Sequence, residues 1–468
     1  MMLFSSLEFL YLFLPLTVAV YFLSPEKLKN YTLLVASLVF YGIAEPKLLP
    51  LMLAVTAFNF IIGVFVEREI QNGNTTLADI LCAFAVAANV LTLFVFKYLD
   101  TIISALGFSP LGIELPTGIS FYTFQALSYV IDVRRRAIRA QKNALLFATY
   151  VTLFPQLVAG PIVRYSEIEA SLTKRRHSVS ECALGARCFC IGLAKKVLLA
   201  NSAGECFERL ARFSADVPTV LGAWLGLLFF AFQIYFDFSG YSDMARGLGK
   251  IFGFDFPENF RYPYTAQSIT DFWRRWHITL SSWFREYVYI SLGGNRKGRL
   301  KTYRNLLITW LLTGLWHGAG LNFVAWGLYF FVLLVVEKAF LLNILKKVPR
   351  ILRHLYALFF ILIGWLIFAS DGDVLSIGQG VSYLGQLFGI GCPLYNNDAL
   401  FELRRNLVFI LIMALSSTPL FVGHFEGLCK KAPTALLAVA NIAAVLSLIL
   451  CTCYLADSGY NPFLYFKF

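Results

Sequence analysis

Leu306–Phe340 reads LLITWLLTGLWHGAGLNFVAWGLYFFVLLVVEKAF, and this stretch decides the fold. Almost every residue in it is apolar, yet it is too long for one perpendicular membrane span, which needs about 20 residues. The run His-Gly-Ala-Gly at 317–320 interrupts it, and basic residues flank it on both sides. Basic loops favour the cytoplasmic face of a membrane. We therefore predict two helices that form a bent hairpin, with both ends at the cytoplasmic face and His317 near the bend.

His317 is an ionisable side chain in a segment apolar enough to lie in lipid. An unpaired polar group in hydrocarbon costs several kcal/mol, so this imidazole must be hydrogen-bonded, face a cavity or take part in chemistry. Histidine ordinarily titrates near neutral pH, which suits proton transfer. A satisfied structural histidine and a functional one both remain open at this point, because intramembrane ionisable residues are often, but not always, functional.

The composition is that of a membrane protein. Of the 468 residues, 58% are hydrophobic and 15% are charged, whereas a soluble domain carries about a quarter charged residues. We predict an all-α polytopic integral membrane protein with a single domain, 1–468, because no linker or soluble segment interrupts the apolar pattern. Besides Leu306–Phe340, the candidate spans are Leu3–Leu23, Tyr31–Ala44, Leu48–Val66, Leu77–Tyr98, Ile119–Val133, Cys182–Ala200, Val217–Phe236, Ile351–Phe368, Leu403–Val422 and Ala432–Tyr454.

The net charge of +12 is concentrated in short links between the apolar runs. The basic clusters are Arg134–Lys142, Lys174–Arg176, Arg296–Arg304 and Lys346–Arg353. This distribution is typical of cytoplasmic loops and of contact with anionic headgroups. We therefore expect membrane lipid, and not nucleic acid, as the partner of these charges.

The apolar segment Leu145–Val163 lies between the first two of these clusters and is broken by Pro155, Gly160 and Pro161. A single crossing would place the two clusters on opposite faces, whereas a re-entrant hairpin keeps both on one face. Irregular backbone at membrane depth is tolerated only where protein or a water-filled cavity surrounds it. We predict a re-entrant segment that lines a cavity.

Polar side chains concentrate in the central third of the chain. Ala231–Asp243 interleaves aromatic residues with Asp237 and Asp243, which can be helix-packing carboxylates or residues of a substrate pathway. The proline-bounded segment Phe256–Tyr264 is not expected to form a long helix.

Asp271–Tyr287 carries its aromatic residues at helical spacing, with arginines among them, and predicts an amphipathic helix. A membrane-surface anchor explains both residue types. It does not explain His277 beside Trp276, because anchoring requires no histidine.

The nine cysteines are scattered along the chain. The pairs Cys188/Cys190 and Cys451/Cys453 have no nearby histidine or second pair to complete a metal site. The sequence therefore predicts no metal site and no disulfide framework.

A resemblance to a known family rests on four motifs in this order: Phe236-Asp-Phe-Ser-Gly-Tyr-Ser-Asp243, Phe256-Pro-Glu-Asn-Phe260, Asp271-Phe-Trp-Arg-Arg-Trp-His277 and Leu315-Trp-His-Gly318. Together they resemble the membrane-bound O-acyltransferases, and within these the bacterial alginate O-acetylation branch. The opening Met2–Phe9 and the ending Tyr460–Phe468 are similar to that branch as well. The resemblance thus runs from one terminus to the other.

The resemblance implies a ring of about 11 transmembrane helices, with re-entrant and interfacial helices, around a central tunnel. It also implies a multi-pass acyltransferase of the bacterial inner (cytoplasmic) membrane. Such an enzyme takes an acyl group from a cytosolic thioester, acetyl-CoA or another acyl-CoA or an acyl carrier. It passes the group across the membrane for O-acylation of a cell-envelope or extracellular polysaccharide. No bound cofactor is implied, and the expected partner is an extracytoplasmic SGNH-type acyltransferase.

Two histidines match the family's pattern. His317 matches its catalytic histidine, and His277 matches a second histidine of the polysaccharide-modifying branch. We expect His317 to deprotonate the attacking hydroxyl, since a positioned base contributes about 10²–10⁴-fold. We expect His277 to orient the acyl carbonyl or stabilise its oxyanion. A covalent acyl-histidine relay is an alternative.

Further residues are expected around the two histidines. The expected substrate-binding and tunnel-lining residues are Trp316, Asp271, Trp273, Trp276, Asn259, Asp237 and Asp243. In the basic loop Gly293–Arg299, the side chains of Arg296, Lys297 and Arg299 can attract the phosphates of the donor. Plain positive-inside topology explains the same charges equally well.

Other functions stay open. Peptidoglycan O-acetylation and D-alanyl transfer to teichoic acid use much of the same pattern. A polysaccharide or lipid transporter would use the intramembrane Asp237, Asp243 and His317 as a proton relay, but no clear internal repeat supports it. A scaffold of a secretion complex would tolerate single histidine changes except for losses of stability.

Overall fold

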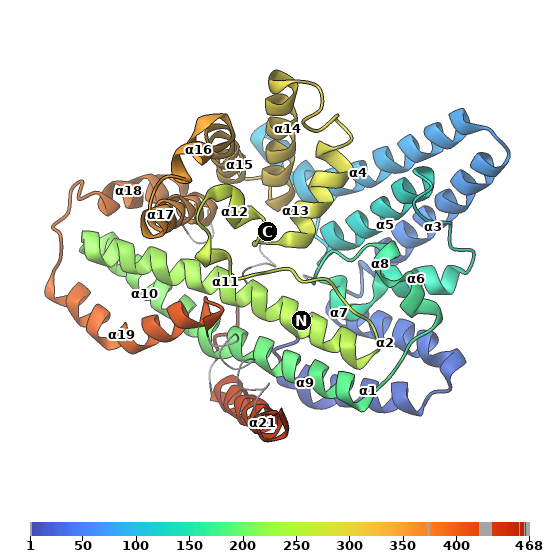
Figure 1. The fold of residues 1–468 in the computed structure, drawn as a ribbon, viewed down its shortest axis with the longest axis horizontal. Coiled ribbons are helices and arrows are strands. Elements are labelled where there is room, and N and C mark those ends of the chain that lie inside the picture. The colour runs from blue at the N-terminus through green and yellow to red at the C-terminus, as the bar shows by residue number, and fades with distance from the viewer. Residues whose placement is uncertain are drawn as a thin grey trace. The chain divides into compact units, whose positions relative to one another are not determined.

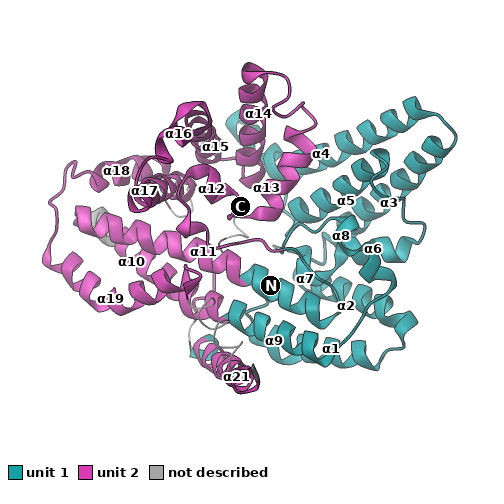
Figure 2. Ribbon diagram, in the orientation of Figure 1, with its two compact units in different colours: residues 1–193, 241–257, 455–457 teal, residues 194–240, 258–454, 458–468 magenta. Residues whose placement is uncertain are grey.

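The computed structural model describes residues 2–158, 160–371, 375–420, 433–457, 459–462 and 464. The chain is 76% helix, and no strand occurs among these residues, so the all-α prediction is confirmed (Figure 1). Contacts divide the chain into two compact units, which are described separately (Figure 2). Unit 1 comprises residues 1–193, 241–257 and 455–457, and unit 2 comprises residues 194–240, 258–454 and 458–468. The single domain 1–468 stays a prediction.

Unit 1 contains the helices of the N-terminal part of the chain. They are η1 (Phe9–Phe13), α1 (Leu14–Leu23), η2 (Glu26–Leu28), α2 (Lys29–Ala44), α3 (Leu49–Gln71), α4 (Thr75–Ala105), α5 (Ile119–Arg134), α6 (Ala144–Thr152), α7 (Phe154–Leu157), α8 (Tyr165–Thr173) and α9 (Val179–Ala194). Helix α3 packs against both α4 and α5. Buried Asn59 of α3 and Asn89 of α4 exchange amide hydrogen bonds of 3.1 and 2.9 Å, which satisfies both side chains in an apolar interior.

The segment Leu145–Val163 is broken, as its proline and glycine residues predict. Helix α6 ends at Thr152, Leu153 has ψ 110°, and α7 begins at Phe154. The Phe154 N–H, which the break frees from a continuous helix, donates to the Ser37 hydroxyl at 3.0 Å. Buried backbone polar groups need such partners. The re-entrant path of this segment through a membrane stays a prediction.

Unit 2 contains most of the remaining helices. They are η3 (Lys195–Asn201), α10 (Ser202–Asp216), α11 (Val220–Ile251), η4 (Pro263–Thr265), α12 (Ile269–Trp273), α13 (Ile278–Phe284), η5 (Arg285–Tyr289), α14 (Arg299–His317), α15 (Leu321–Val336), η6 (Glu337–Leu341), α16 (Leu342–Leu345), α17 (Arg350–Ala369), α18 (Ile377–Leu387), α19 (Asn397–Ser416) and α21 (Pro433–Asp457). The last part of α11 belongs to unit 1, and so do the last residues of α21.

Helices α14 and α15 form the predicted hairpin, and His317 is the last residue of α14 before the bend. The two helices lie side by side (Figure 1) because glycines remove side chains from their contact. A Cβ on Gly314 would lie 2.3 Å from the Phe323 carbonyl oxygen, and one on Gly327 would lie 2.5 Å from that of Trp310. Small residues permit this close approach of membrane helices.

The prediction of one amphipathic helix over Asp271–Tyr287 is wrong. Helix α12 ends at Trp273, and α13 begins only at Ile278. Between them His277 has φ 43° and ψ 55°, a left-handed conformation that ends a helix. The Ile278 N–H donates to the Asn259 carbonyl at 2.9 Å instead of to a preceding turn. A tertiary hydrogen bond therefore replaces the helical one. The proline-bounded segment Phe256–Tyr264 forms no long helix, as predicted.

Among the described residues, six helices are long and apolar enough to cross a membrane. They are Leu49–Gln71, Thr75–Ala105, Val220–Ile251, Leu321–Leu345, Arg350–Ala369 and Thr434–Asp457. The shorter apolar helix Phe9–Leu23 lies within the span Leu3–Leu23 that the sequence predicts. These lengths and compositions agree with a multi-pass membrane protein.

Candidate active site

A cavity of about 980 Å³ lies in unit 2, and both His277 and His317 line it. The two histidines are far apart in the sequence, and they reach the cavity from the α12–α13 break and from the end of α14. Aromatic residues line much of the rest, including Trp273, Trp276 and Trp310. The cationic lining residues are Arg274, Arg285, Arg296, Lys297 and Lys338, and no Asp or Glu is among the described lining residues. Such a cavity suits an anionic ligand with an apolar end.

His317 is 6% exposed and packs among aromatic rings. Its ring centroid lies 4.8 Å from that of Trp316, 5.1 Å from that of Trp326 and 5.1 Å from that of Phe368, each edge to face. Edge-to-face packing is a favoured geometry for aromatic rings. A Cβ on the following Gly318 would meet the Phe323 ring at 2.4 Å, so glycine is needed for this ring to pack so close to the chain. The imidazole is therefore held in one place at the cavity.

His277 is 2% exposed and is oriented by Asn259. The Thr279 N–H and the Thr279 hydroxyl donate to Asn259 Oδ1 at 3.2 and 2.9 Å, which identifies this atom as the amide oxygen. His277 Nδ1 lies 3.1 Å from the same oxygen and must therefore carry a hydrogen to donate to it. In the neutral ring, Nε2 then has the lone pair. Burial lowers the pKa of His277 to about 3, so the ring is neutral at physiological pH.

Aromatic rings also fix His277 from two other segments. The Phe238 ring of α11 lies edge to face with the imidazole at 4.6 Å between centroids. The Trp316 ring, which neighbours His317 in the sequence, lies 6.0 Å from it. Trp316 thus packs on both histidines, although it is not among the residues that line the cavity.

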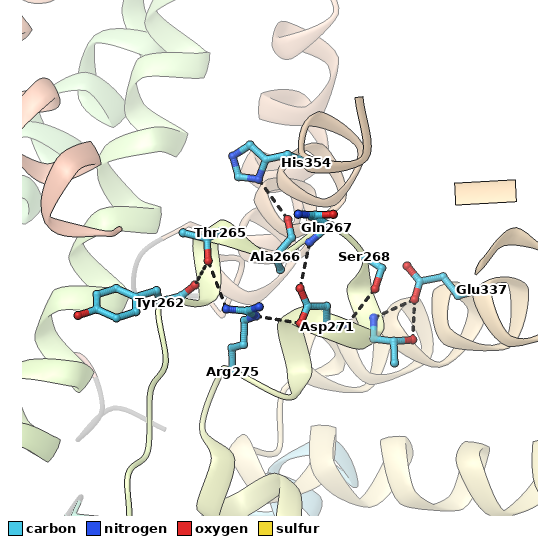
Figure 3. A network of polar contacts seen from close by, with 10 residues as sticks. Tyr262, Thr265, Ala266, Gln267, Ser268, Asp271, Arg275, Glu337 and His354 are labelled. Atoms are coloured by element: carbon cyan, nitrogen blue, oxygen red, sulfur yellow. Dashed lines mark hydrogen bonds and ion pairs between the residues drawn. The ribbon is translucent and has the colours of Figure 1, made fainter. Parts of the chain in front are cut away.

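Asp271 belongs to the network of polar contacts that Figure 3 shows. Its Oδ1 accepts from Arg275 Nε at 2.8 Å, and its Oδ2 accepts from the Gln267 N–H at 3.2 Å. The Ser268 hydroxyl accepts from the Asp271 N–H and caps α12. The side chain of Asp271 therefore holds the loop before α12 and does not line the cavity.

Glu337 holds the start of α12 from the other side (Figure 3). It is fully buried and accepts from the N–H groups of Ile269 and Thr270 at 2.6 and 2.8 Å. The Thr270 and Tyr356 hydroxyls donate to it as well, at 2.6 and 3.1 Å. The sequence predictions missed Glu337. A carboxylate within a long apolar run is the signal that could have found it.

Asp237 and Asp243 lie away from the cavity lining. Asp237 forms a buried ion pair with Lys196, with 2.8 Å between Oδ1 and Nζ. Asp243 belongs to unit 1, where its carboxylate lies 3.7 Å from the Arg246 guanidinium. Asn259 is not among the lining residues but hydrogen-bonds two that are, His277 and Ile278.

Only part of the basic loop Gly293–Arg299 lies at the cavity. Arg296 and Lys297 line the cavity, whereas Arg299 begins α14 and is not among the lining residues. Three cations that the sequence did not single out for the donor also line it: Arg274, Arg285 and Lys338. Among the described residues, no group of three or more His, Cys, Asp or Glu side chains could hold a metal ion.

Comparison with known proteins decides the family. The sequence profile of the membrane-bound O-acyltransferase family matches residues 48–370. The chain belongs to this family. It is a multi-pass membrane acyltransferase, and the region matched contains both histidines of the cavity.

Relatives with known names cover most or all of this membrane-bound O-acyltransferase. The probable alginate O-acetylase of Azotobacter vinelandii is 43% identical over 79% of the chain and 75% of the relative. That of Pseudomonas putida is 36% identical over 100% of both chains. The peptidoglycan O-acetyltransferase of Helicobacter pylori is 33% identical over 100% of the chain and 98% of the relative. These relatives show that the chain is a membrane O-acetyltransferase.

Proposed function

We propose that this membrane-bound O-acyltransferase takes an acetyl group from a cytosolic thioester and passes it on for O-acetylation of a cell-envelope or extracellular polysaccharide. One observation carries the proposal: the cavity of about 980 Å³ joins two buried histidines to five cations, and the described residues that line it include no carboxylate. A thioester donor such as acetyl-CoA has this character, with phosphates at one end and a small acyl group at the other. The relatives that act on alginate support a polysaccharide as the acceptor.

In the proposed reaction, the acceptor oxygen attacks the carbonyl carbon of the thioester. His317 takes the hydroxyl proton, the carbon–sulfur bond breaks, and the proton passes to the departing thiolate. A hydroxyl is a poor nucleophile at neutral pH, and general-base catalysis supplies about 10²–10⁴-fold. The hydroxyl belongs to the polysaccharide or to a partner that accepts the group first.

The hydrogen bond from His277 to Asn259 bears on its proposed role. With a hydrogen on Nδ1, the neutral ring offers Nε2 as an acceptor. In this tautomer His277 orients a hydroxyl donor of the substrate. Orientation of the acyl carbonyl, the role expected from the sequence, requires a hydrogen on Nε2 and stays a prediction.

The larger architecture is also a proposal. A ring of about 11 transmembrane helices around a tunnel, in the bacterial inner membrane, would let the acyl group cross without the whole donor. An extracytoplasmic SGNH-type acyltransferase would then complete delivery outside. The family relationship supports both, and the six long apolar helices among the described residues agree with a multi-pass protein.

A second acceptor is favoured by one comparison. The peptidoglycan O-acetyltransferase relative aligns with the whole chain, so peptidoglycan is the alternative polymer. The relatives that transfer D-alanine to teichoic acid cover only 48% of the chain, which makes that reaction the weaker alternative. The known activities of all these relatives favour acyl transfer over transport or a scaffold role.

The test is acetyl transfer by the purified protein in proteoliposomes, with radiolabelled acetyl-CoA outside and alginate or peptidoglycan fragments inside. We expect His317→Ala to lower the rate by at least about 10²-fold, because it removes the base. His177→Ala is the matched control, since His177 belongs to unit 1 and does not line the cavity. Near-normal transfer by folded, inserted His317→Ala would contradict the assignment. Labelling of peptidoglycan alone would select the second acceptor.

A further inference from the structure

The described residues of the C-terminal motif found in the sequence are bound within unit 2 by a set of buried polar groups, and residues 463 and 465–468 lie outside the described residues. We name its described residues, 459–462 and 464, the C-terminal strap. The Leu464 N–H donates to Asp237 Oδ2 at 2.9 Å, and Lys196 Nζ donates to the Pro462 carbonyl. The Asn201 amide donates to the Tyr460 carbonyl at 3.3 Å and to Asn461 Oδ1 at 3.2 Å.

A buried ion pair forms the centre of this attachment. The side chains of Lys196 and Asp237 are 2% and 3% exposed, and their charged atoms lie 2.8 Å apart. Lys196 Nζ also donates to Asn201 Oδ1 at 2.7 Å. Removal of one member of a buried pair is strongly destabilising, because the other charge is left uncompensated. The strap completes the pair, because one of its carbonyls accepts from Lys196 and one of its N–H groups donates to Asp237.

Local helix geometry brings Lys196 to this place. Lys196 and Asn201 lie in η3, a π-helical turn between α9 and α10. A π-helix hydrogen-bonds residues five apart, and these two residues are five apart. Their side chains therefore lie on one face and bind the strap together. Such turns are frequent at functional sites.

Asp237, to which the strap is attached, is directly followed in the sequence by a residue that contacts the active site. Asp237 is followed in α11 by Phe238, whose ring packs edge to face on His277 at 4.6 Å. The Phe260 ring lies against both Phe238 and His277, with centroids 4.9 and 6.5 Å away. A shift of α11 at Asp237 would therefore displace the surface on which His277 rests.

We propose that the C-terminal strap and Lys196 are positioning elements of the active site. The strap binds the Lys196–Asp237 pair and holds α11 in the position that places Phe238 against His277. This inference rests on the proposed function of His277. It assigns a role to the terminal motif and to Asp237, which does not line the cavity.

The first experiment separates positioning from general stability by kinetics of the full-length enzyme. Asp237→Asn keeps an oxygen for the Leu464 N–H but removes the charge that faces Lys196. We expect kcat per folded enzyme to fall about 10-fold or more, with the KM of acetyl-CoA within about twofold of its original value. Glu402→Gln is the matched control, because Glu402 is also buried in unit 2 and pairs with Arg209 at 3.2 Å. An equal loss of kcat in both variants would overturn the proposal.

The second experiment tests the strap itself through a double-mutant cycle. Leu464→Pro removes the N–H that Asp237 accepts, whereas Leu464→Ala keeps it. We expect Leu464→Pro, and not Leu464→Ala, to lower kcat, and we expect its effect to be absent in an Asp237→Ala background, which has no side-chain oxygen to accept from the Leu464 N–H. Normal kcat in Leu464→Pro, or full additivity of the two changes, would overturn the proposal.

The same double-mutant cycle can be measured through the Tm of each variant, which requires no substrate. Coupling between Leu464→Pro and Asp237→Ala in Tm supports the docked strap, even if no variant transfers acetyl groups and the proposed function fails. Absence of coupling in Tm, in an enzyme that does transfer acetyl groups, overturns the strap and leaves the proposed function in place.

Discussion

At the scale of single residues, the site depends on which ring nitrogen of His277 carries the hydrogen. Asn259 Oδ1 accepts from the Thr279 N–H, the Thr279 hydroxyl and His277 Nδ1, so one amide oxygen both begins α13 and sets the tautomer. The left-handed backbone at His277 is strained for a non-glycine residue, and such strain is typical of functional positions. These bonds compensate for the strain and hold Nε2 in one direction.

Asn259→Asp tests this arrangement through pH. A carboxylate keeps the hydrogen-bond acceptors but favours the charged imidazole, so it raises the pKa of His277 from its value of about 3. Below the raised pKa the ring is protonated and loses its lone pair. We expect the transfer rate of this variant to fall as pH falls through that value and to recover as pH rises above it. The measurement is the pH dependence of kcat between pH 5 and 9.

Asn259→Ala is the control for that profile. It removes the acceptor without adding charge, so it should lower the rate at every pH and create no new acidic limb. A profile of Asn259→Asp that matches the unsubstituted enzyme would show that His277 need not be neutral in the reaction.

At the scale of elements, the α14–α15 hairpin positions His317 through close helix contact. Gly314 and Gly327 lie in this contact, where a methyl group would overlap backbone carbonyls of the partner helix. The carboxylate of Glu337, beyond the end of α15, holds the start of α12. The segment from α14 to η6 therefore supports both histidines, because it carries His317 and holds the helix that precedes His277.

Gly327→Ala tests the close contact. Its Cβ would lie 2.5 Å from the Trp310 carbonyl oxygen, so the helices must separate. Overpacking of this kind costs about 1–3 kcal/mol, and we expect a lower Tm together with a lower kcat. Gly378→Ala in α18 is the matched control, because its Cβ would meet nothing within 4 Å and alanine favours a helix. Equal Tm values for the two variants would disprove the close-contact explanation.

At the scale of the whole molecule, the basic residues that give the net charge of +12 lie in two kinds of place. Some of them lie in exposed loops, as topology predicts, and others line the cavity of unit 2 without acidic neighbours. Charges of one sign in a cleft raise the local concentration of an oppositely charged ligand, and salt screens this effect within about 10 Å at 0.1 M.

The double variant Arg296→Ala/Lys297→Ala tests the cavity charges. We expect the KM of acetyl-CoA to rise about 10-fold with little change in kcat, and the salt dependence of KM to weaken. Lys301→Ala is the control, since this exposed residue carries the same charge nearby but does not line the cavity. Arg299→Ala separates the two explanations of the loop: a similar rise in KM there would place the phosphate contacts outside the cavity.

Sequence and structure contributed differently to this site. The hairpin around His317 was predictable because a long apolar run with a His-Gly-Ala-Gly interruption leaves few alternatives in lipid. The break before His277 was not, because the Asp271–Tyr287 pattern favours one helix and the competing hydrogen bonds come from Asn259. Lys338 was missed as a cavity residue because, apart from Glu337, its neighbours in the sequence are apolar.

The sequence by itself determined that this is a membrane protein, that it is helical and which two histidines are the candidates for catalysis. It could do so because composition, periodicity and local motifs are properties of neighbouring residues. Only the tertiary structure decided the tautomer of His277, the cations of the cavity and the pairing of Asp237 with Lys196 and the C-terminal strap. The physical reason is that buried polar groups must find partners, and in a helical membrane protein those partners come from segments far apart in the chain.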